Sequence, residues 1–264
     1  MIINRLNKLV LVPILLIGCS EYVEVTAHRG ASGLAPENTI ASVKKAIELK
    51  ADFSEIDAQE ISDGSIILFH DTSLNRTTGN NGNIWNQSIQ TLSQMEAGSW
   101  FSEEFTGEKI PLLEEIIDLV NDAMKLNIEL KMNGNEKLLA KKVVKIVHSK
   151  DFVDKCIITS FDFNEVNKVR EIDRDIKIGY IFKNIPEDIN VFTADCEILS
   201  VSRKIVDKEF VKKAKLHNKE IHVWTVNDPD EMERLINLGV DNIITNRPDV
   251  LSSVLKKLSR NPFL

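Results

Sequence analysis

The sequence predicts an α/β fold in which a parallel sheet closes into a barrel, with one extra β-hairpin. Short apolar, β-branched runs alternate with amphipathic helical stretches from Val23 onward, and this alternation favours a parallel sheet. The number of repeats favours a closed barrel over an open sheet, and one such barrel commonly needs about 250 residues. Because no linker or low-complexity run divides residues 19–264, we expect them to form a single domain.

The expected strands are short and rich in isoleucine, valine and phenylalanine. In chain order they are Val23–Ala27, Phe53–Ala58, Ile66–Phe69, Leu126–Leu130, Cys156–Ser160, Ile176–Phe182, Ile198–Val201, Ile221–Val226 and Asn242–Thr245. The expected helices lie between these strands and carry apolar residues at helical spacing, as Ile116, Leu119 and Val120 illustrate. They are Thr39–Leu49, Leu112–Lys125, Glu136–Ser149, Asn164–Asp173, Asp207–His217 and Pro229–Leu238.

One pair of expected strands has no helix between them. Asp63-Gly64 lies there instead, and Asp-Gly between apolar runs is a strong hairpin signal. With these two residues as the loop, the pairing places Asp57 directly opposite His70. Cross-strand neighbours have Cβ atoms about 5 Å apart, so a carboxylate and an imidazole are expected to meet at one site.

Residues 1–18 are expected to be a bacterial lipoprotein signal peptide and not part of the fold. Arg5 and Lys8 precede the apolar run Leu9–Ile17, which is too short to span a membrane, and Cys19 follows at the expected cleavage point. We expect Cys19 to be lipidated, so that the protein is exported and anchored to the periplasmic or cell-surface face of the envelope. The alternative is an ordinary secretory signal followed by a chance cysteine.

Composition excludes some classes of partner and site. The net charge of −7, from 33 basic and 40 acidic residues, argues against a nucleic-acid partner, which would select for a basic face. The hydrophobic fraction of 43% supports a large core. Cys156 and Cys196 are too few for a usual zinc site, and we expect buried free thiols, with a disulfide as the alternative.

Two charged pairs end strand-like runs, and each pair lies on one strand face, since residues i and i+2 point the same way. They are Glu55 with Asp57, and Glu129 with Lys131. The three carboxylates offer hard oxygen ligands, which suit Ca²⁺ or Mg²⁺, and Lys131 can neutralise a phosphate. The alternatives are a solvated network of ion pairs, and a lysine that pairs with Glu129 alone.

Two histidines follow expected strands and are candidates for proton transfer. His28 and His70 each end a strand at the expected barrel mouth, where such barrels build their active sites. Arg29 offers a planar fork to a phosphate. Trp224 ends another strand and is expected to wall the substrate pocket, with a core position as the alternative. These features together indicate a metal-dependent phosphodiesterase with the hairpin beside its active site.

The chain resembles the glycerophosphodiester phosphodiesterases over most of its length, from about Val25 to Val250. The motifs that carry the resemblance run in the family's order: Ala27-His28-Arg29-Gly30, Pro36-Glu37-Asn38-Thr39, Glu55-Ile56-Asp57, Ser62-Asp63-Gly64, His70-Asp71, Arg76-Thr77-Thr78-Gly79, Ala97-Gly98-Ser99-Trp100-Phe101, Ile110-Pro111-Leu112-Leu113, Glu129-Leu130-Lys131, Ser160-Phe161-Asp162, Trp224-Thr225-Val226-Asn227 and Ile243-Ile244-Thr245-Asn246-Arg247-Pro248. The family often has aspartate where Asn246 stands.

The resemblance implies a TIM-type (β/α)8 barrel that hydrolyses glycerophosphodiesters, such as glycerophosphocholine and glycerophosphoethanolamine, to glycerol 3-phosphate and an alcohol. It implies one divalent cation, Ca²⁺ or Mg²⁺, and a small-molecule substrate. The residue roles that it implies follow the motifs: metal ligands Glu55, Asp57 and Glu129; acid–base pair His28 and His70; phosphate-binding residues Arg29 and Lys131; and Glu37, which orients Arg29 or the metal-bound water.

Two other functions stay open at this point. A related lyase would release a cyclic phosphate from a lipid, and the identity of the product distinguishes it. A surface lipoprotein that binds glycerophosphodiesters or host ligands without turnover would be expected to lack some of the five acid–base and metal-binding residues, all of which are present here.

Overall fold

Eight parallel strands close into a barrel in the computed structural model, which describes residues 22–259. The order around the barrel is β1-β9-β8-β7-β6-β5-β4-β2, and pairing of β1 with β2 closes it, which confirms the predicted TIM-type fold. The strands are β1 (Glu24–His28), β2 (Phe53–Glu60), β4 (Lys125–Leu130), β5 (Cys156–Ser160), β6 (Lys177–Phe182), β7 (Ile198–Ser202), β8 (Glu220–Trp224) and β9 (Asn242–Thr245). The expected signal peptide and Cys19 lie outside the described residues.

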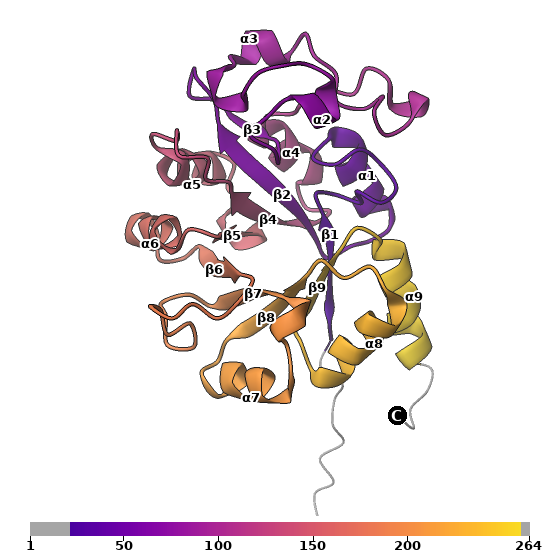
Figure 1. The fold of residues 1–264 in the computed structure, drawn as a ribbon, viewed down its shortest axis with the longest axis vertical. Helices are drawn as coiled ribbons and strands as arrows, with labels where there is room; N and C mark the ends of the chain where they lie inside the picture. Colours follow the sequence, from indigo (N-terminus) through magenta and orange to yellow (C-terminus); the bar gives the residue numbers. More distant parts are fainter. Residues whose placement is uncertain (1–21, 260–264) are drawn as a thin grey trace, which may run out of the picture.

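Helices surround the barrel on its outer side (Figure 1). They are α1 (Ile40–Glu48), α4 (Leu113–Val120), α5 (Leu139–Ser149), α6 (Phe163–Ile172), α7 (Lys208–Leu216), α8 (Pro229–Leu238) and α9 (Pro248–Ser259). The prediction carried α4 to Lys125, but Asn121 (φ 39°, ψ −110°) ends the helix and Lys125 begins β4. α9 was not predicted. None of the helices in residues 22–259 is long and apolar enough to cross a membrane.

The hairpin of β2 with the antiparallel strand β3 (Ile66–Leu68) is present, but its predicted register is wrong by one residue. Ala58 pairs with Leu68, and the backbone N–H of Phe69 donates to the carbonyl of Asp57, so Asp57 lies opposite Phe69 and not His70. The loop has three residues, Ser62-Asp63-Gly64, and closes with a bond from Ile61 N to Ser65 O. Gly64 adopts φ 85°, a value that favours glycine and accommodates the extra residue.

The segment between β3 and α4 packs over one side of the barrel end, at the top of Figure 1. It contains α2 (Asn75–Thr78) and α3 (Ile89–Leu92), with 3-10 turns at Ile84–Asn86 and Glu103–Phe105. A small apolar core of its own holds it, including Phe69, Leu74, Ile84 and Leu92. Because Phe69 belongs to this core, the residue that follows it, His70, is brought to the barrel mouth.

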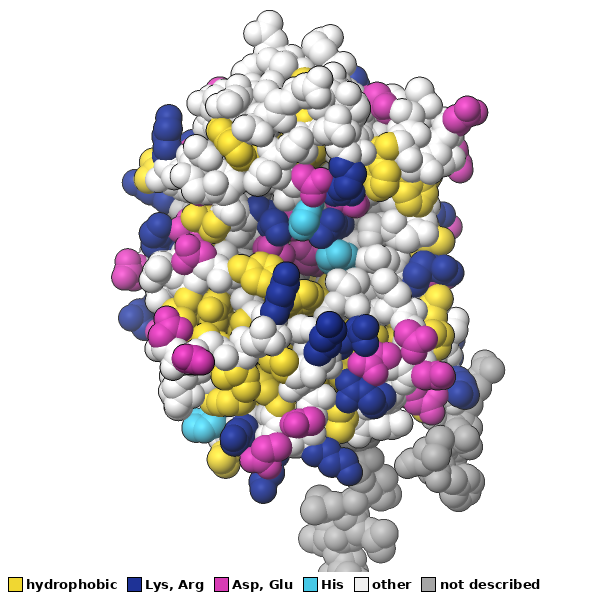
Figure 2. Space-filling model, viewed as in Figure 1, with side chains coloured by type: hydrophobic (Ala, Val, Ile, Leu, Met, Phe, Trp, Pro, Cys, Tyr) yellow, Lys and Arg dark blue, Asp and Glu magenta, His cyan; other side chains and the backbone are white. Residues whose placement is uncertain are grey.

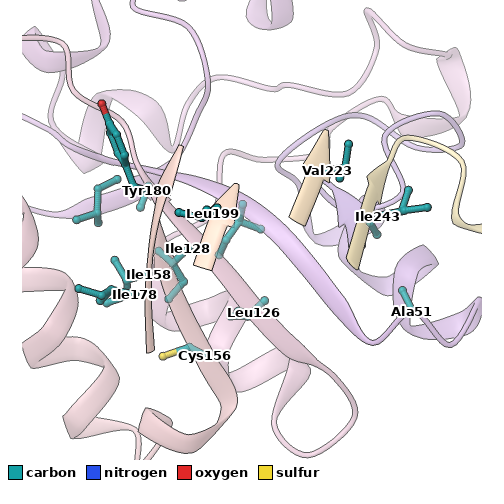
Figure 3. Close-up of a cluster of buried hydrophobic side chains, with 14 of the residues drawn as sticks. Ala51, Leu126, Ile128, Cys156, Ile158, Ile178, Tyr180, Leu199, Val223 and Ile243 are labelled. Atoms are coloured by element: carbon teal, nitrogen blue, oxygen red, sulfur yellow. The ribbon is translucent and has the colours of Figure 1, made fainter. Parts of the chain in front are cut away.

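Alternate residues of each barrel strand face the surrounding helices, where they form the main core. Figure 3 shows Ile128, Ile158 and Ile178, from β4, β5 and β6, side by side in this cluster. Inside the barrel, Phe53, Ile157 and Ile198 form a smaller apolar cluster. Cys156 and Cys196 are buried free thiols, as expected.

Candidate active site

Charged side chains gather at the carboxyl ends of the barrel strands, around a pocket of about 310 Å³. In Figure 2, histidine, acidic and basic side chains meet near the centre of one face, beside a group of hydrophobic side chains. The lining residues include His28, Arg29, Glu55, His70, Glu129, Lys131, Phe161, Lys183 and Trp224. A larger cavity of about 530 Å³ lies at the amino ends of the strands, but the groups suited to phosphodiester chemistry line the smaller one.

The three predicted metal ligands form one buried cluster. Oxygens of Glu55, Asp57 and Glu129 lie within 4.8 Å of one another. Burial raises the pKa of Glu55 well above its usual value, and Asp57 and Glu129 raise it further. Burial, with Asp57, raises the pKa of Glu129 to about 7. One oxygen of Glu55 and one of Asp57 have no hydrogen-bond partner in the part of the chain that the structure describes, so the cluster concentrates negative charge that a cation would offset.

Asp57 is the carboxylate that the surrounding side chains keep ionised. Burial acts to raise its pKa, but the charges of Arg29 and Lys131 prevail and hold that pKa below its usual value. Asn38, which the sequence analysis did not assign to the site, donates to Asp57 Oδ2 at 2.7 Å and accepts from the Asp57 backbone N–H at 3.0 Å. Its place in the Pro-Glu-Asn-Thr motif was the available signal.

Arg29 and Lys131 meet the carboxylates from two different strands. The Nε of Arg29 lies 3.2 Å from Asp57 Oδ2. Lys131 Nζ donates to Glu129 Oε1 at 2.8 Å and lies 3.6 Å from Asp57 Oδ1. Arg29 and Lys131 therefore border the carboxylate cluster, and both side chains line the same pocket.

Glu37 lies between two guanidinium groups. It accepts from Arg29 Nη1 at 2.8 Å, and from Arg76 Nη1 and Nη2 at 2.8 and 2.7 Å. Burial opposes ionisation, but these two arginines, Arg76 first, hold the pKa of Glu37 below its usual value. The structure thus places Glu37 against Arg29, one of the two groups that the resemblance implied Glu37 would orient.

His28 ends β1 and has a neutral partner. Its Nδ1 lies 2.7 Å from Asn246 Oδ1, which can only accept, so Nδ1 carries a proton and Nε2 is free in the neutral ring. Nε2 lies 3.9 Å from Glu55 Oε2. Burial, followed by the charge of Arg29, lowers the pKa of His28 to about 4.

His70 has a charged partner. Its Nδ1 lies 2.8 Å from Asp71 Oδ1, and Arg76 donates to both oxygens of Asp71. The bonds from Arg76 lower the pKa of Asp71 to about 2, with His70 contributing. Gln59, buried on β2, donates to the carbonyls of the residues on either side of His70, Phe69 O at 2.6 Å and Asp71 O at 3.0 Å.

Aromatic side chains form one wall of the pocket. The rings of Trp224 and Phe161 pack edge to face with centroids 5.5 Å apart, and the buried Nε1 of Trp224 has no hydrogen-bond partner. Lys131 Nζ lies 5.8 Å from the centroid of Phe161. Trp224 therefore borders the pocket, as predicted, while Lys183, which also lines it, had no signal in the sequence.

Comparisons of this chain with known protein families, sequences and structures agree with the geometry of the site. The model of the glycerophosphoryl diester phosphodiesterase family matches residues 28–250. A glycerophosphodiester phosphodiesterase of Caldanaerobacter subterraneus is 33% identical over 241 residues, covering 88% of this chain and 98% of that protein, and one of Bacillus subtilis is 30% identical over 250 residues, covering 87% and 85%. A phosphodiesterase of Oleispira antarctica, solved in complex with the product sn-glycerol-3-phosphate, matches with a TM-score of 0.83 at 31% identity, covering 88% of this chain and 96% of that one. By the extent of the family match, this chain belongs to the glycerophosphoryl diester phosphodiesterase family.

Proposed function

We propose that this protein is a metal-dependent enzyme that hydrolyses glycerophosphodiesters to glycerol 3-phosphate and an alcohol. The observation that carries the proposal is the convergence of three buried carboxylates, two cations and two histidines on one pocket. Relatives named for this activity, and a similar structure solved with sn-glycerol-3-phosphate, support it.

The carboxylate cluster fits a divalent cation. Its donors are all hard oxygens, the donor set that Ca²⁺ and Mg²⁺ prefer. Two of these oxygens are buried and accept no hydrogen bond from any residue within 22–259. Glu55, Asp57 and Glu129 would hold the ion. When bound, it would offset negative charge on the phosphoryl oxygens and favour ionisation of the nucleophile.

Arg29 and Lys131 are proposed to bind the phosphate. Both carry their charge at the edge of the carboxylate cluster, where hydrogen bonds to phosphoryl oxygens become stronger as negative charge builds in the transition state. Glu37 keeps the guanidinium of Arg29 in place through Nη1, which leaves its Nη2 for the substrate.

We propose a role for each histidine from the groups around it. Both rings hold the proton on Nδ1 and so offer Nε2 to the substrate. Burial and the charge of Arg29 favour the neutral ring of His28, so we propose that it acts as the base that takes the proton of the nucleophile. His70, which bonds the carboxylate of Asp71 through Nδ1, is proposed as the acid that protonates the departing alkoxide.

We also propose that Cys19 carries the lipid anchor and that residues 19–264 are one exported domain. The sequence of the first nineteen residues supports this. Cys19 itself lies outside the described residues. Loss of lipid labelling in Cys19→Ser tests the anchor.

A coupled glycerol 3-phosphate assay on the purified protein tests the activity. Release from glycerophosphocholine that stops with chelator and in Glu55→Ala is the expected result. His28→Ala and His70→Ala are each expected to lose most turnover while still binding a divalent cation. Near-normal rates in either histidine variant would refute the acid–base assignment, and a cyclic phosphate as the final product would indicate a lyase.

A further inference from the structure

A groove of about 510 Å³ adjoins the catalytic pocket at Phe161, which lines both. The groove runs over the segments that follow β4 and β5 and along β6. Its other lining residues are Met132, Asp162, Phe163, Asn164, Tyr180, Asp188 and Ile189. We propose that this groove binds the cationic, ammonium-bearing head group of the leaving alcohol and so selects zwitterionic diesters. The proposal rests on the phosphodiesterase function above.

The aromatic lining of the groove is suited to an organic cation. Phe161 is 43% exposed, so part of its ring is open to a ligand beside the catalytic pocket. The rings of Phe163 and Tyr180 pack with centroids 5.0 Å apart. Aromatic faces attract quaternary and primary ammonium groups through the ring quadrupole, without needing a directional hydrogen bond.

Tyr180 brings to the groove a hydroxyl that is free to bind a ligand. The side chain is only 8% exposed, yet within residues 22–259 its hydroxyl has no hydrogen-bond partner. In Figure 3 the hydroxyl points away from the apolar cluster around Ile158 and Ile178. The hydroxyl is therefore open to a hydrogen bond from a polar ligand or water in the groove.

Two carboxylates give the groove negative charge without any lysine or arginine in its lining. Neither Asp162 nor Asp188 has a lysine or arginine within ion-pair distance among the residues that the structure describes. Asp162 Oδ1 accepts the backbone N–H groups of Asn164 and Glu165 at the start of α6, which leaves Oδ2 for a ligand. Both carboxylates line the groove together with Tyr180, so both can act on a ligand bound there; after burial, both also raise the pKa of Tyr180.

The order of charges follows the order of groups in a zwitterionic diester. Lys131 and Lys183 line the pocket on one side of Phe161, and Asp162 and Asp188 line the groove on the other. A phosphate held by the lysines therefore places an ammonium two carbons away over the exposed ring and toward the carboxylates. A neutral alcohol such as glycerol gains nothing from these charges, so the groove discriminates between diesters at the leaving group.

The test compares two substrates that differ in the charge of the leaving alcohol, glycerophosphocholine and glycerophosphoglycerol. Exposed charge pairs and cation–π contacts contribute about 0.5–1 kcal/mol each. Removing both carboxylates in Asp162→Asn/Asp188→Asn is therefore expected to lower the ratio of kcat/KM values, choline over glycerol, by about five-fold to 30-fold, and Asp188→Asn alone by about two-fold to five-fold. Asparagine keeps the helix cap at position 162, so a fall in the ratio is not a folding defect.

Glu187→Gln is the matched control. Glu187 is exposed in the same loop as Asp188 and does not line the groove, so the same loss of one charge is expected to leave the ratio unchanged. A ratio that stays unchanged in the double variant, or falls equally in the control, would overturn the head-group proposal. Wild-type protein that hydrolyses neither diester would overturn the phosphodiesterase function itself, which separates the two failures.

Discussion

Replacing Gln59 with leucine tests whether His70 is positioned through the backbone on both of its sides. The buried carboxamide of Gln59 donates to Phe69 O at 2.6 Å and to Asp71 O at 3.0 Å, while its oxygen accepts from Asn133 Nδ2 at 3.0 Å. Gln59 does not line the catalytic pocket. The substitution therefore removes support for the His70 loop without removing any group that meets the substrate.

The size of the effect follows from the bonds that are lost. Leucine leaves two backbone carbonyls without their donor, and a buried carbonyl without a partner costs about 1–3 kcal/mol. Because Asp71 is partly exposed, water can satisfy one of them, and we expect a loss of about 2–4 kcal/mol in the free energy of unfolding. Displacement of a catalytic group by about 1 Å can cost about 100-fold in rate, so kcat is expected to fall by about ten-fold to 100-fold.

Steady-state kinetics and thermal unfolding of Gln59→Leu measure these two quantities. The expected pattern is a lower Tm and a lower kcat with KM changed by less than about three-fold, because Arg29 and Lys131 still bind the phosphate. Gln90→Leu is the control, since its exposed side chain makes no hydrogen bond within the described residues. A variant at position 59 that keeps wild-type kcat despite a lower Tm would refute the positioning argument.

Three further predictions concern the carboxylates and thiols. Glu55→Gln removes one of three mutually repelling carboxylates, so the metal-free protein is expected to gain in Tm, while the rise in Tm on adding Ca²⁺ or Mg²⁺ shrinks; an undiminished rise would exclude Glu55 as a ligand. Burial raises the pKa of Cys156 to about 12, so in a Cys19→Ser background iodoacetamide should label it only after unfolding; rapid labelling of native protein would contradict this. Contact with His222, then Lys177, holds the pKa of Glu220 at about 2 despite burial. The stability that this carboxylate adds is present above pH about 4.5 and is lost as the pH falls toward 2. The difference in unfolding free energy between wild type and Glu220→Gln, measured by denaturant unfolding, should therefore shrink over that pH range.

Strand and helix patterning made the barrel predictable, but not the ends of its elements. Most barrel strands bury their outer face under a helix, so apolar runs and amphipathic stretches alternate in the sequence. The end of α4 depended on the backbone of Asn121. The hairpin register depended on the length of the loop, which has three residues and not two. The dipeptide Asp63-Gly64 is compatible with both lengths.

The sequence alone determined which residue types are brought to the barrel mouth, because every parallel strand of a closed barrel ends on the same side. Glu55, Asp57, Glu129 and Lys131 could be grouped by strand face for that reason. Only the tertiary structure decided which group each of them meets. Asn246 reaches His28 from a segment far away in the chain, and the groove beside Phe161 combines Tyr180 of β6 with residues from the segments after β4, β5 and β6. Such contacts depend on side-chain directions and distances across the barrel, which no local pattern in a sequence encodes.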